Sequence, residues 1–296
     1  MKKTMLLLLA MVSLAACEKV EVVDGSTPEE WEEVEYKYTK KFTFTVKGDF
    51  GAATFNAPRT RGYLQADGQS MTDLWVFDYI DGKLVQSVHQ SADDEAWGKP
   101  TMALAYGSHH VYFVASRGEG ATLDAEGHTI TWTGPRDTFW KDYEVEVVST
   151  SNGNRAVTLD RVATKLRVVV ADEVPTGCAA VVVTPARWYY GWDYVNGVAM
   201  ASQQTERRVT VPESYVGSTG QLAVSIFGLS GVDEWVTNVA IQAQDAEGGV
   251  LGSATITGAP FKANRSTEYS GNLFGSAGGL DVSVNGDWET PKTGTW

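Results

Sequence analysis

The sequence lacks the common motifs of catalytic chemistry. It contains no Gly-x-Ser-x-Gly nucleophile turn, no His-Glu-x-x-His zinc motif, no phosphate-binding glycine loop and no EF-hand spacing. We therefore expect no enzyme activity, no cofactor and no metal site. His109 and His110 are adjacent, but neighbouring side chains of a strand point to opposite faces, so the two are not expected to share an ion.

Cysteine is scarce, with only Cys17 and Cys178 in a chain of 296 residues. The residues around Cys17 indicate a separate role for it, described next, so Cys178 is left without a disulfide partner. Small and apolar residues surround Cys178 in the sequence. This setting predicts a buried, unreactive thiol.

The apolar run near the start, MLLLLAMV at residues 5–12, is too short to cross a bilayer, which needs about 20 residues. It follows a basic start and precedes SLAAC at residues 13–17, the pattern of an export signal. A leucine three residues before a cysteine resembles the lipobox of bacterial lipoproteins. This predicts removal of residues 1–16, lipidation of Cys17 and anchoring in the outer membrane. A plain signal peptide is the alternative.

Positive charge is in deficit, with 24 Lys and Arg against 37 Asp and Glu and a formal net charge of −13. No basic stripe is present, which argues against nucleic acid as a partner. The segment 17–36 is acidic and contains Gly25-Ser26-Thr27-Pro28. Its composition predicts an extended tether between the lipid and the folded body.

Sustained helical periodicity is missing, and short segments with alternating apolar residues are present instead. Lys41 to Lys47 is the first of them. Turn signals separate many of these segments, among them Asp81-Gly82, Asn152-Gly153 and Asn196-Gly197. This pattern predicts an all-β protein. A second series begins near Leu159, so we expect two tandem β-sandwiches, in residues 37–158 and 159–296.

Aromatic residues are concentrated between Arg187 and Tyr194. Strand geometry would place four rings on one face, those of Trp188, Tyr190, Trp192 and Tyr194. If that face is exposed, it could stack on host or bacterial surface glycans, with Arg187 and Asp193 at its edge. If it is buried, the rings belong to the core or to a contact between domains. Both interpretations remain open at this point.

A series of loose motifs follows in a characteristic order. DLWVFD at residues 73–78 precedes an Asp-Gly hairpin, RVATKLRVVV opens the second series at residue 161, and KANRSTEYSGNLF at residues 262–274 precedes VNGDW at 284–288. Together with the lipobox and the Phe-Thr-Phe-Thr-Val strand, this order resembles the fimbrillin superfamily of Bacteroidales, which builds surface fimbriae. The resemblance implies two transthyretin-like Greek-key β-sandwiches and no enzyme activity.

Subunits of that family are exported as lipoproteins and polymerise by strand exchange. A shaft precursor is cut after an arginine, which removes its first strand, and a strand of another subunit fills the groove. Carried onto this sequence, the first strand is Lys41 to Lys47, and Arg59 and Arg61 are the candidate processing sites in an accessible stretch. Both arginines also fit an ordinary exposed loop.

The C-terminal tail, Leu280 to Trp296, contains the candidate donor strand, with alternating apolar residues at Leu280, Val282 and Val284. If this tail instead folds onto its own sandwich, the chain can accept a strand but cannot donate one. Such a chain suits the end or the base of a fimbria. We therefore expect other fimbrial subunits as partners and favour an anchor or minor subunit that serves adhesion, with a glycan-binding lipoprotein as the alternative.

Overall fold

The computed structural model describes residues 38–49, 65–66, 69–200, 206–231, 233–274 and 280–285. These residues form strands almost throughout, with one short 3₁₀ helix, η2 (Glu213–Tyr215). The prediction of an all-β protein is therefore confirmed. Within the described residues, no helix is both long enough and apolar enough to span a bilayer.

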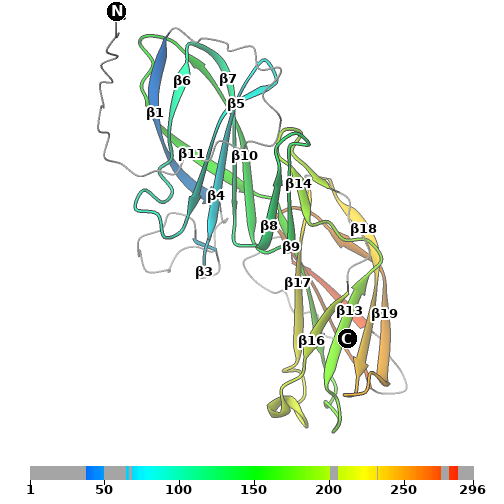
Figure 1. The fold of residues 1–296 in the computed structure, drawn as a ribbon. Helices are drawn as coiled ribbons and strands as arrows, with labels where there is room; N and C mark the ends of the chain where they lie inside the picture. Colours follow the sequence, from blue (N-terminus) through cyan, green and yellow to red (C-terminus); the bar gives the residue numbers. More distant parts are fainter. Residues whose placement is uncertain are drawn as a thin grey trace, which may run out of the picture.

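The N-terminal half is built on one seven-stranded sheet. Its strands follow the order β5 (Lys83–Ser91), β4 (Asp73–Ile80), β7 (Gly107–Ser116), β10 (Thr138–Val147), β11 (Asn154–Arg161), β1 (Thr39–Asp49) and β6 (Thr101–Ala105). β10 and β11 pair only near Phe139 and Trp140, so the sheet folds over at this corner into two layers (Figure 1). Side chains of both layers meet in one core, where the Phe44 ring of β1 lies edge-on to the Phe113 ring of β7 at 5.2 Å.

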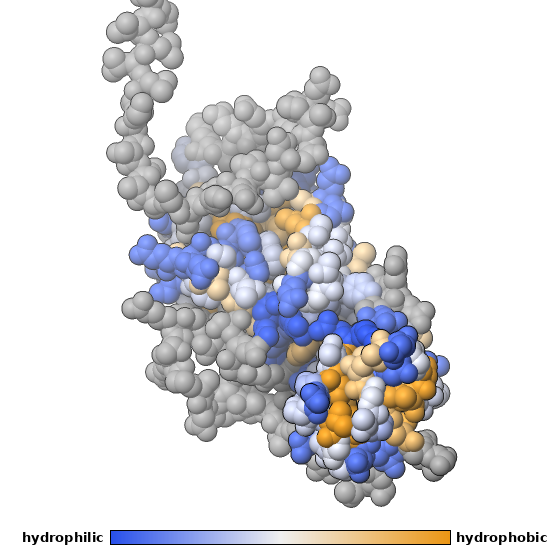
Figure 2. All heavy atoms as spheres, turned by 60° about the horizontal axis from the view of Figure 1, so that its bottom comes forward, coloured by the Kyte–Doolittle hydropathy of each residue, from blue (hydrophilic) through white to orange (hydrophobic). Residues whose placement is uncertain are grey.

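The C-terminal half is a sandwich of two four-stranded sheets. One sheet has the order β17 (Ala223–Leu229), β12 (Ala163–Val170), β20 (Arg265–Gly271) and β21 (Leu280–Asn285). The other has the order β16 (Arg207–Thr210), β13 (Ala180–Pro185), β18 (Trp235–Gln244) and β19 (Val250–Phe261). Alternating apolar residues of both sheets form its core, including Leu166 and Val181. In the tilted view of Figure 2, apolar residues gather on the surface of the part of the molecule that is turned forward.

A third sheet takes strands from both halves of the chain. Its order is β15 (Val198–Met200), β14 (Gly191–Asp193), β9 (Thr129–Gly134) and β8 (Glu119–Asp124). Its apolar side chains pack with Trp75, Phe77 and Tyr112 from β4 and β7. The expected division between residues 158 and 159 falls inside β11, whose Leu159 packs in the N-terminal core. The hairpin β14–β15 pairs with β9 and so lies with the N-terminal half. A separate pair, β2 (Gln65–Ala66) and β3 (Gln69–Ser70), completes the described strands.

Candidate functional site

The first strand, β1, occupies the middle of one layer of the N-terminal half. It pairs in parallel with β11, from Thr43↔Asn154 to Asp49↔Asp160, and antiparallel with β6. Its alternating residues Phe42, Phe44 and Val46 are fully buried. The strand predicted at Lys41 to Lys47 is thus present, and its apolar side chains pack in the middle of the N-terminal core.

The turn before β11 is fitted closely against β1. The Thr43 amide donates a 2.7 Å hydrogen bond to the Gly153 carbonyl oxygen. A Cβ at Gly153 would lie only 2.2 Å from the Lys41 carbonyl oxygen, so a side chain is excluded there. The Asn152-Gly153 signal therefore does mark a turn, but the strands on either side pass to different layers because the second one docks on β1.

The candidate donor strand is paired within its own chain. β21 runs antiparallel to β20, with Leu280 opposite Gly271, Val282 opposite Tyr269 and Val284 opposite Thr267. Thr267 and Tyr269 are buried on β20. In this conformation, the backbone groups on that edge of β20 are already engaged by the tail. The residues beyond Asn285 lie outside the described part of the chain.

The aromatic segment does not form one strand face. Trp188 and Trp192 are each 1% exposed and Tyr194 is fully buried. The Trp188 ring enters the C-terminal core, where Nε1 donates a 2.8 Å hydrogen bond to the Phe227 carbonyl oxygen. Trp192 and Tyr194 instead pack in the cluster beneath the third sheet, and Tyr194 stacks on Phe77 at 4.1 Å. The expectation of a shared face was wrong.

The backbone explains this division. The Leu229 amide bonds to the Tyr189 carbonyl oxygen in the C-terminal half, and the Trp132 amide bonds to the Tyr190 carbonyl oxygen on β9. The chain therefore crosses between halves at Tyr190, and only Gly191–Asp193 is a strand. Tyr190 is half-buried, whereas Arg187 is exposed and its guanidinium lies over the Trp235 ring.

The cleft next to Tyr190 is too small to support the glycan-binding interpretation. Trp188 and Tyr190 line a cleft of about 90 Å³ between β9 and β17. Ligand pockets typically have volumes of roughly 300–1,000 Å³. Burial of three of the four rings removes the observation on which the glycan-binding interpretation depended.

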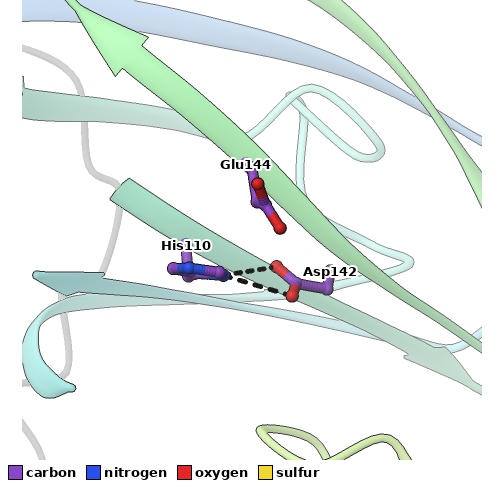
Figure 3. Close-up of side chains that lie close together, drawn as sticks. All are labelled: His110, Asp142 and Glu144. Carbon is purple, nitrogen blue, oxygen red and sulfur yellow. Dashed lines mark hydrogen bonds and ion pairs between the residues drawn. The ribbon is translucent and has the colours of Figure 1, made fainter. Parts of the chain in front are cut away.

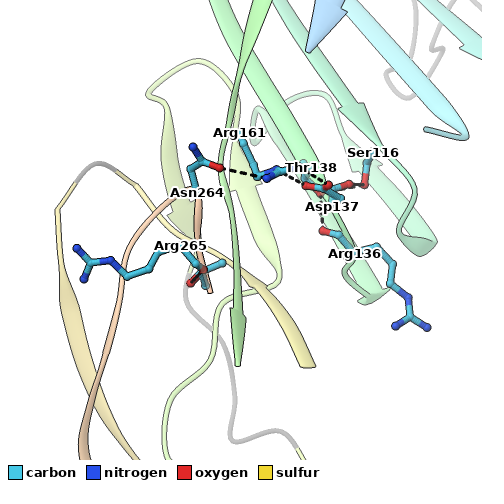
Figure 4. A network of polar contacts seen from close by, with 8 residues as sticks. Ser116, Arg136, Asp137, Thr138, Arg161, Asn264 and Arg265 are labelled. Atoms are coloured by element: carbon cyan, nitrogen blue, oxygen red, sulfur yellow. Dashed lines mark hydrogen bonds and ion pairs between the residues drawn. The ribbon is translucent and has the colours of Figure 1, made fainter. Parts of the chain in front are cut away.

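A buried ion pair lies where the two halves meet (Figure 4). Arg161 at the end of β11 contacts Asp137 twice, with Nε 2.9 Å from Oδ1 and Nη2 donating a 3.0 Å hydrogen bond to Oδ2. Its Nη1 donates to the Asn264 side-chain oxygen of the C-terminal half. Both charged residues are nearly fully buried. Arg161 therefore links the corner of the N-terminal sheet to the loop between β19 and β20.

The Asp137–Arg161–Asn264 network escaped sequence reasoning because its members are far apart in the chain. Asn264 has a positive φ of 57°, a conformation that asparagine tolerates better than most residues. Its backbone amide donates a hydrogen bond to the carbonyl oxygen of Ala163, the first residue of β12. An asparagine inside the Lys-Ala-Asn-Arg stretch was a local signal for a tight turn, but nothing local indicates its partner.

The remaining predicted positions divide into two groups. Cys178 is buried, as expected, and burial raises the pKa of its thiol. Cys17, Arg59 and Arg61 lie outside the described residues, as do the leader 1–16 and the tether 17–36. Lipidation and processing therefore remain predictions.

Comparison with known proteins identifies the fold. No family model and no curated protein matches this sequence. A "putative adhesin" from Bacteroides ovatus superposes with a TM-score of 0.52 at 11% identity, over 87% of this chain and 96% of that chain. A "putative adhesin" from Bacteroides thetaiotaomicron gives 0.50 at 10% identity, over 84% and 99%. This chain shares their fold.

A "putative polysaccharide binding" protein from Bacteroides thetaiotaomicron has the same fold, with a TM-score of 0.50 at 9% identity over 83% of this chain and 97% of that chain. Proteins with different printed functions thus share this architecture, and the fold alone does not distinguish among them.

Proposed function

We propose that this chain is a non-enzymatic subunit of surface fimbriae, of the fimbrillin type, and that it serves as an anchor or minor subunit in adhesion. The observation that carries the proposal is the position of β1. An N-terminal strand sits between β11 and β6 and fills a core with Phe42, Phe44 and Val46. The fold shared with the two Bacteroides proteins described as adhesins supports the same role.

Strand exchange follows from the physics of that position. If β1 is removed, β11 and β6 lose their pairing partner and the core loses three apolar side chains, which leaves an open groove. A strand with the same alternation from another subunit would restore both the hydrogen bonds and the apolar contacts. Cleavage after Arg59 or Arg61, between β1 and the next described strand, would release β1 together with the lipid on Cys17.

The pairing of β21 favours an end position in the fimbria. A tail that remains on β20 cannot be inserted into a neighbour at the same time. After loss of β1, such a chain would accept a strand without donating one, as an end subunit does. A chain that keeps its leader on Cys17 keeps β1 in its own groove and would be held at the outer membrane. A subunit of the shaft would need both to lose β1 and to release its tail.

Mass spectrometry of the native N-terminus tests this role, with protein from intact cells compared with protein from sheared filaments. An anchor keeps a lipidated Cys17 in both samples. A terminus at Thr60 or Gly62 in filaments would contradict the anchor assignment and indicate a polymerised subunit. Lipidated protein that never co-purifies with filaments would count against a fimbrial role altogether. A double variant, Arg59→Ala with Arg61→Ala, controls for processing at these two sites.

A disulfide between β20 and β21 tests whether the tail is donated. Ser270 and Asp281 lie opposite each other in the register, so Ser270→Cys with Asp281→Cys can hold the tail on its own sandwich. We expect the oxidised variant to enter filaments as the reduced variant does. Exclusion of the oxidised form alone would show that the chain donates its tail.

A further inference from the structure

The structure pairs three histidines with aspartates, and one of these pairs differs from the others. His89 lies 2.9 Å from Asp73, and buried His109 lies 2.7 Å from Asp78. The third pair, His110 and Asp142, is joined by a second carboxylate, that of Glu144 (Figure 3). This cluster, His110–Asp142–Glu144, lies on β7 and β10 on the face opposite to the His109 side chain.

The geometry of the cluster is close to that of a metal site. His110 Nδ1 lies 3.1 and 3.2 Å from the two oxygens of Asp142. One ligand atom from each of the three side chains lies within 4.8 Å of the other two. Ligands bound to zinc at 2.0–2.2 Å in a tetrahedron are about 3.4 Å apart, so modest side-chain rotations would bring the three atoms onto one ion.

The surrounding strands hold the cluster in place. The ladder between β7 and β10 is continuous from Ser116↔Thr138 to Gly107↔Val147 and sets His110 directly opposite Glu144. The His110 ring also stacks on the Tyr112 ring, with centroids 6.0 Å apart and an angle of 18°. A rigid ladder and a stacked ring reduce the ordering that an ion would have to impose on its ligands.

The charge of the cluster also favours a cation. Among the described residues, no Lys or Arg forms an ion pair with Asp142 or Glu144, and the carboxylate of Glu144 accepts no hydrogen bond. The neighbouring Lys141 is engaged with Asp160. Two carboxylates beside one imidazole are left without a basic partner on a chain whose formal net charge is −13.

We propose that His110, Asp142 and Glu144 bind a divalent first-row transition ion, with Zn²⁺ as the expected occupant. The imidazole nitrogen favours such an ion over Ca²⁺ or Mg²⁺, which prefer sets of oxygen ligands. Three protein ligands leave a fourth position open to water or to a donor atom of another molecule. His109 and His110 point to opposite faces of β7, as expected, and so do not share an ion. The carboxylates that approach His110 come from β10, a strand whose position beside β7 the sequence did not reveal.

Isothermal titration calorimetry of the full-length, tag-free protein with ZnCl₂ tests the site. We expect saturable binding of one ion, at least about tenfold weaker in His110→Ala, since even outer-shell changes at metal sites cost 10–100-fold. Glu144→Gln should also weaken binding. The matched control is His89→Ala, which removes an exposed histidine that pairs with one aspartate and should leave binding unchanged.

Three results would overturn the proposal. They are the absence of saturable Zn²⁺ binding, equal binding by wild type and His110→Ala, and equal loss in His110→Ala and His89→Ala. CaCl₂ provides a second probe, and Ca²⁺ binding that matches Zn²⁺ and ignores His110→Ala would also contradict it. Circular dichroism of each variant verifies that the fold is retained.

Discussion

The opening strands of the two halves occupy equivalent positions but differ in how they are held. β1 lies between a parallel neighbour, β11, and an antiparallel one, β6. β12 likewise lies between parallel β20 and antiparallel β17. Both carry alternating buried side chains, such as Phe44 and Leu166. The two halves thus repeat one arrangement around a central first strand.

The two halves differ in the strand pairing that would remain if the first strand of each were removed. Without β12, β20 would still pair along its length with β21. Without β1, β11 would keep only its short contact with β10 near Phe139 and Trp140. β12 also follows Arg161 directly, at the buried ion pair with Asp137. The N-terminal half therefore depends on its first strand more than the C-terminal half does, which supports the proposal that a strand exchange would take place in this half.

The largest expected effect comes from removing the aromatic side chains of β1 from the N-terminal core. In Phe42→Ala with Phe44→Ala, each lost ring should lower the free energy of unfolding by about 3–5 kcal/mol, because buried apolar volume is replaced by cavity. Chemical denaturation measures the loss, and hydrogen exchange should locate it in β6 and β11.

The counterpart in the second half is Leu166→Ala with Val168→Ala. Its exchange should increase in β17 and β20 and spare β6 and β11. If either double variant accelerates exchange equally in both halves, the two sandwiches unfold as one unit, and the stronger dependence of the N-terminal half on its own first strand is contradicted.

The second prediction concerns the junction. Arg161→Met leaves the Asp137 carboxylate buried without its partner and should cost about 3–5 kcal/mol. Thermal or chemical unfolding measures this. Replacing both residues, by Arg161→Met with Asp137→Leu, should recover most of the stability, because no lone charge is then buried.

The control for the junction is Arg167→Met, which removes the partly exposed pair with Glu268. It should cost no more than about 1 kcal/mol. Equal losses at the two sites would mean that burial does not set the importance of the Arg161 pair.

The strand content of this chain was accessible from local patterns. The alternation of Lys41 to Lys47 identified β1, and Asp81-Gly82 identified the turn between β4 and β5, where both residues have positive φ. Periodicity and turn chemistry report on a few neighbouring residues, and these features depend on nothing more.

The same local patterns could not predict which distant segments contact each other in the folded chain. Trp188 and Trp192 alternate in sequence, yet they lie in different cores because the backbone at Tyr190 bonds to another sheet. The carboxylates near His110 lie on a neighbouring strand whose register cannot be read from either segment alone. The pairing of distant strands decides such sites, and it is a property of the whole fold.

A smaller effect is expected where the turn touches β1. Gly153→Ala would place a Cβ 2.2 Å from the Lys41 carbonyl oxygen, and the forced shift should cost about 1–3 kcal/mol. The matched control is Gly231→Ala, where nothing lies within 4 Å of the added Cβ and the change should be neutral or slightly stabilising. Urea denaturation compares the two, and equal effects would show that the contact between the turn and β1 is unimportant.

The smallest effect should come from titration of the buried pair of His109 on β7 and Asp78 on the neighbouring β4. Burial alone lowers the pKa of His109, but the hydrogen bond and the charge of Asp78 outweigh it and raise the pKa above the ordinary 6.5. The ring bonds to an Asp78 oxygen and to the Ala105 carbonyl oxygen, two acceptors that together favour the doubly protonated form.

A raised pKa contributes stability that is fully present below pH 6.5 and is lost as the pH rises through the folded-state value. The stability advantage of wild type over His109→Gln should therefore shrink between pH 6 and pH 9 in urea titrations. An advantage that is constant with pH would mean that His109 contributes by packing alone. The charge of the His109–Asp78 pair would then make no contribution to the stability of the N-terminal half.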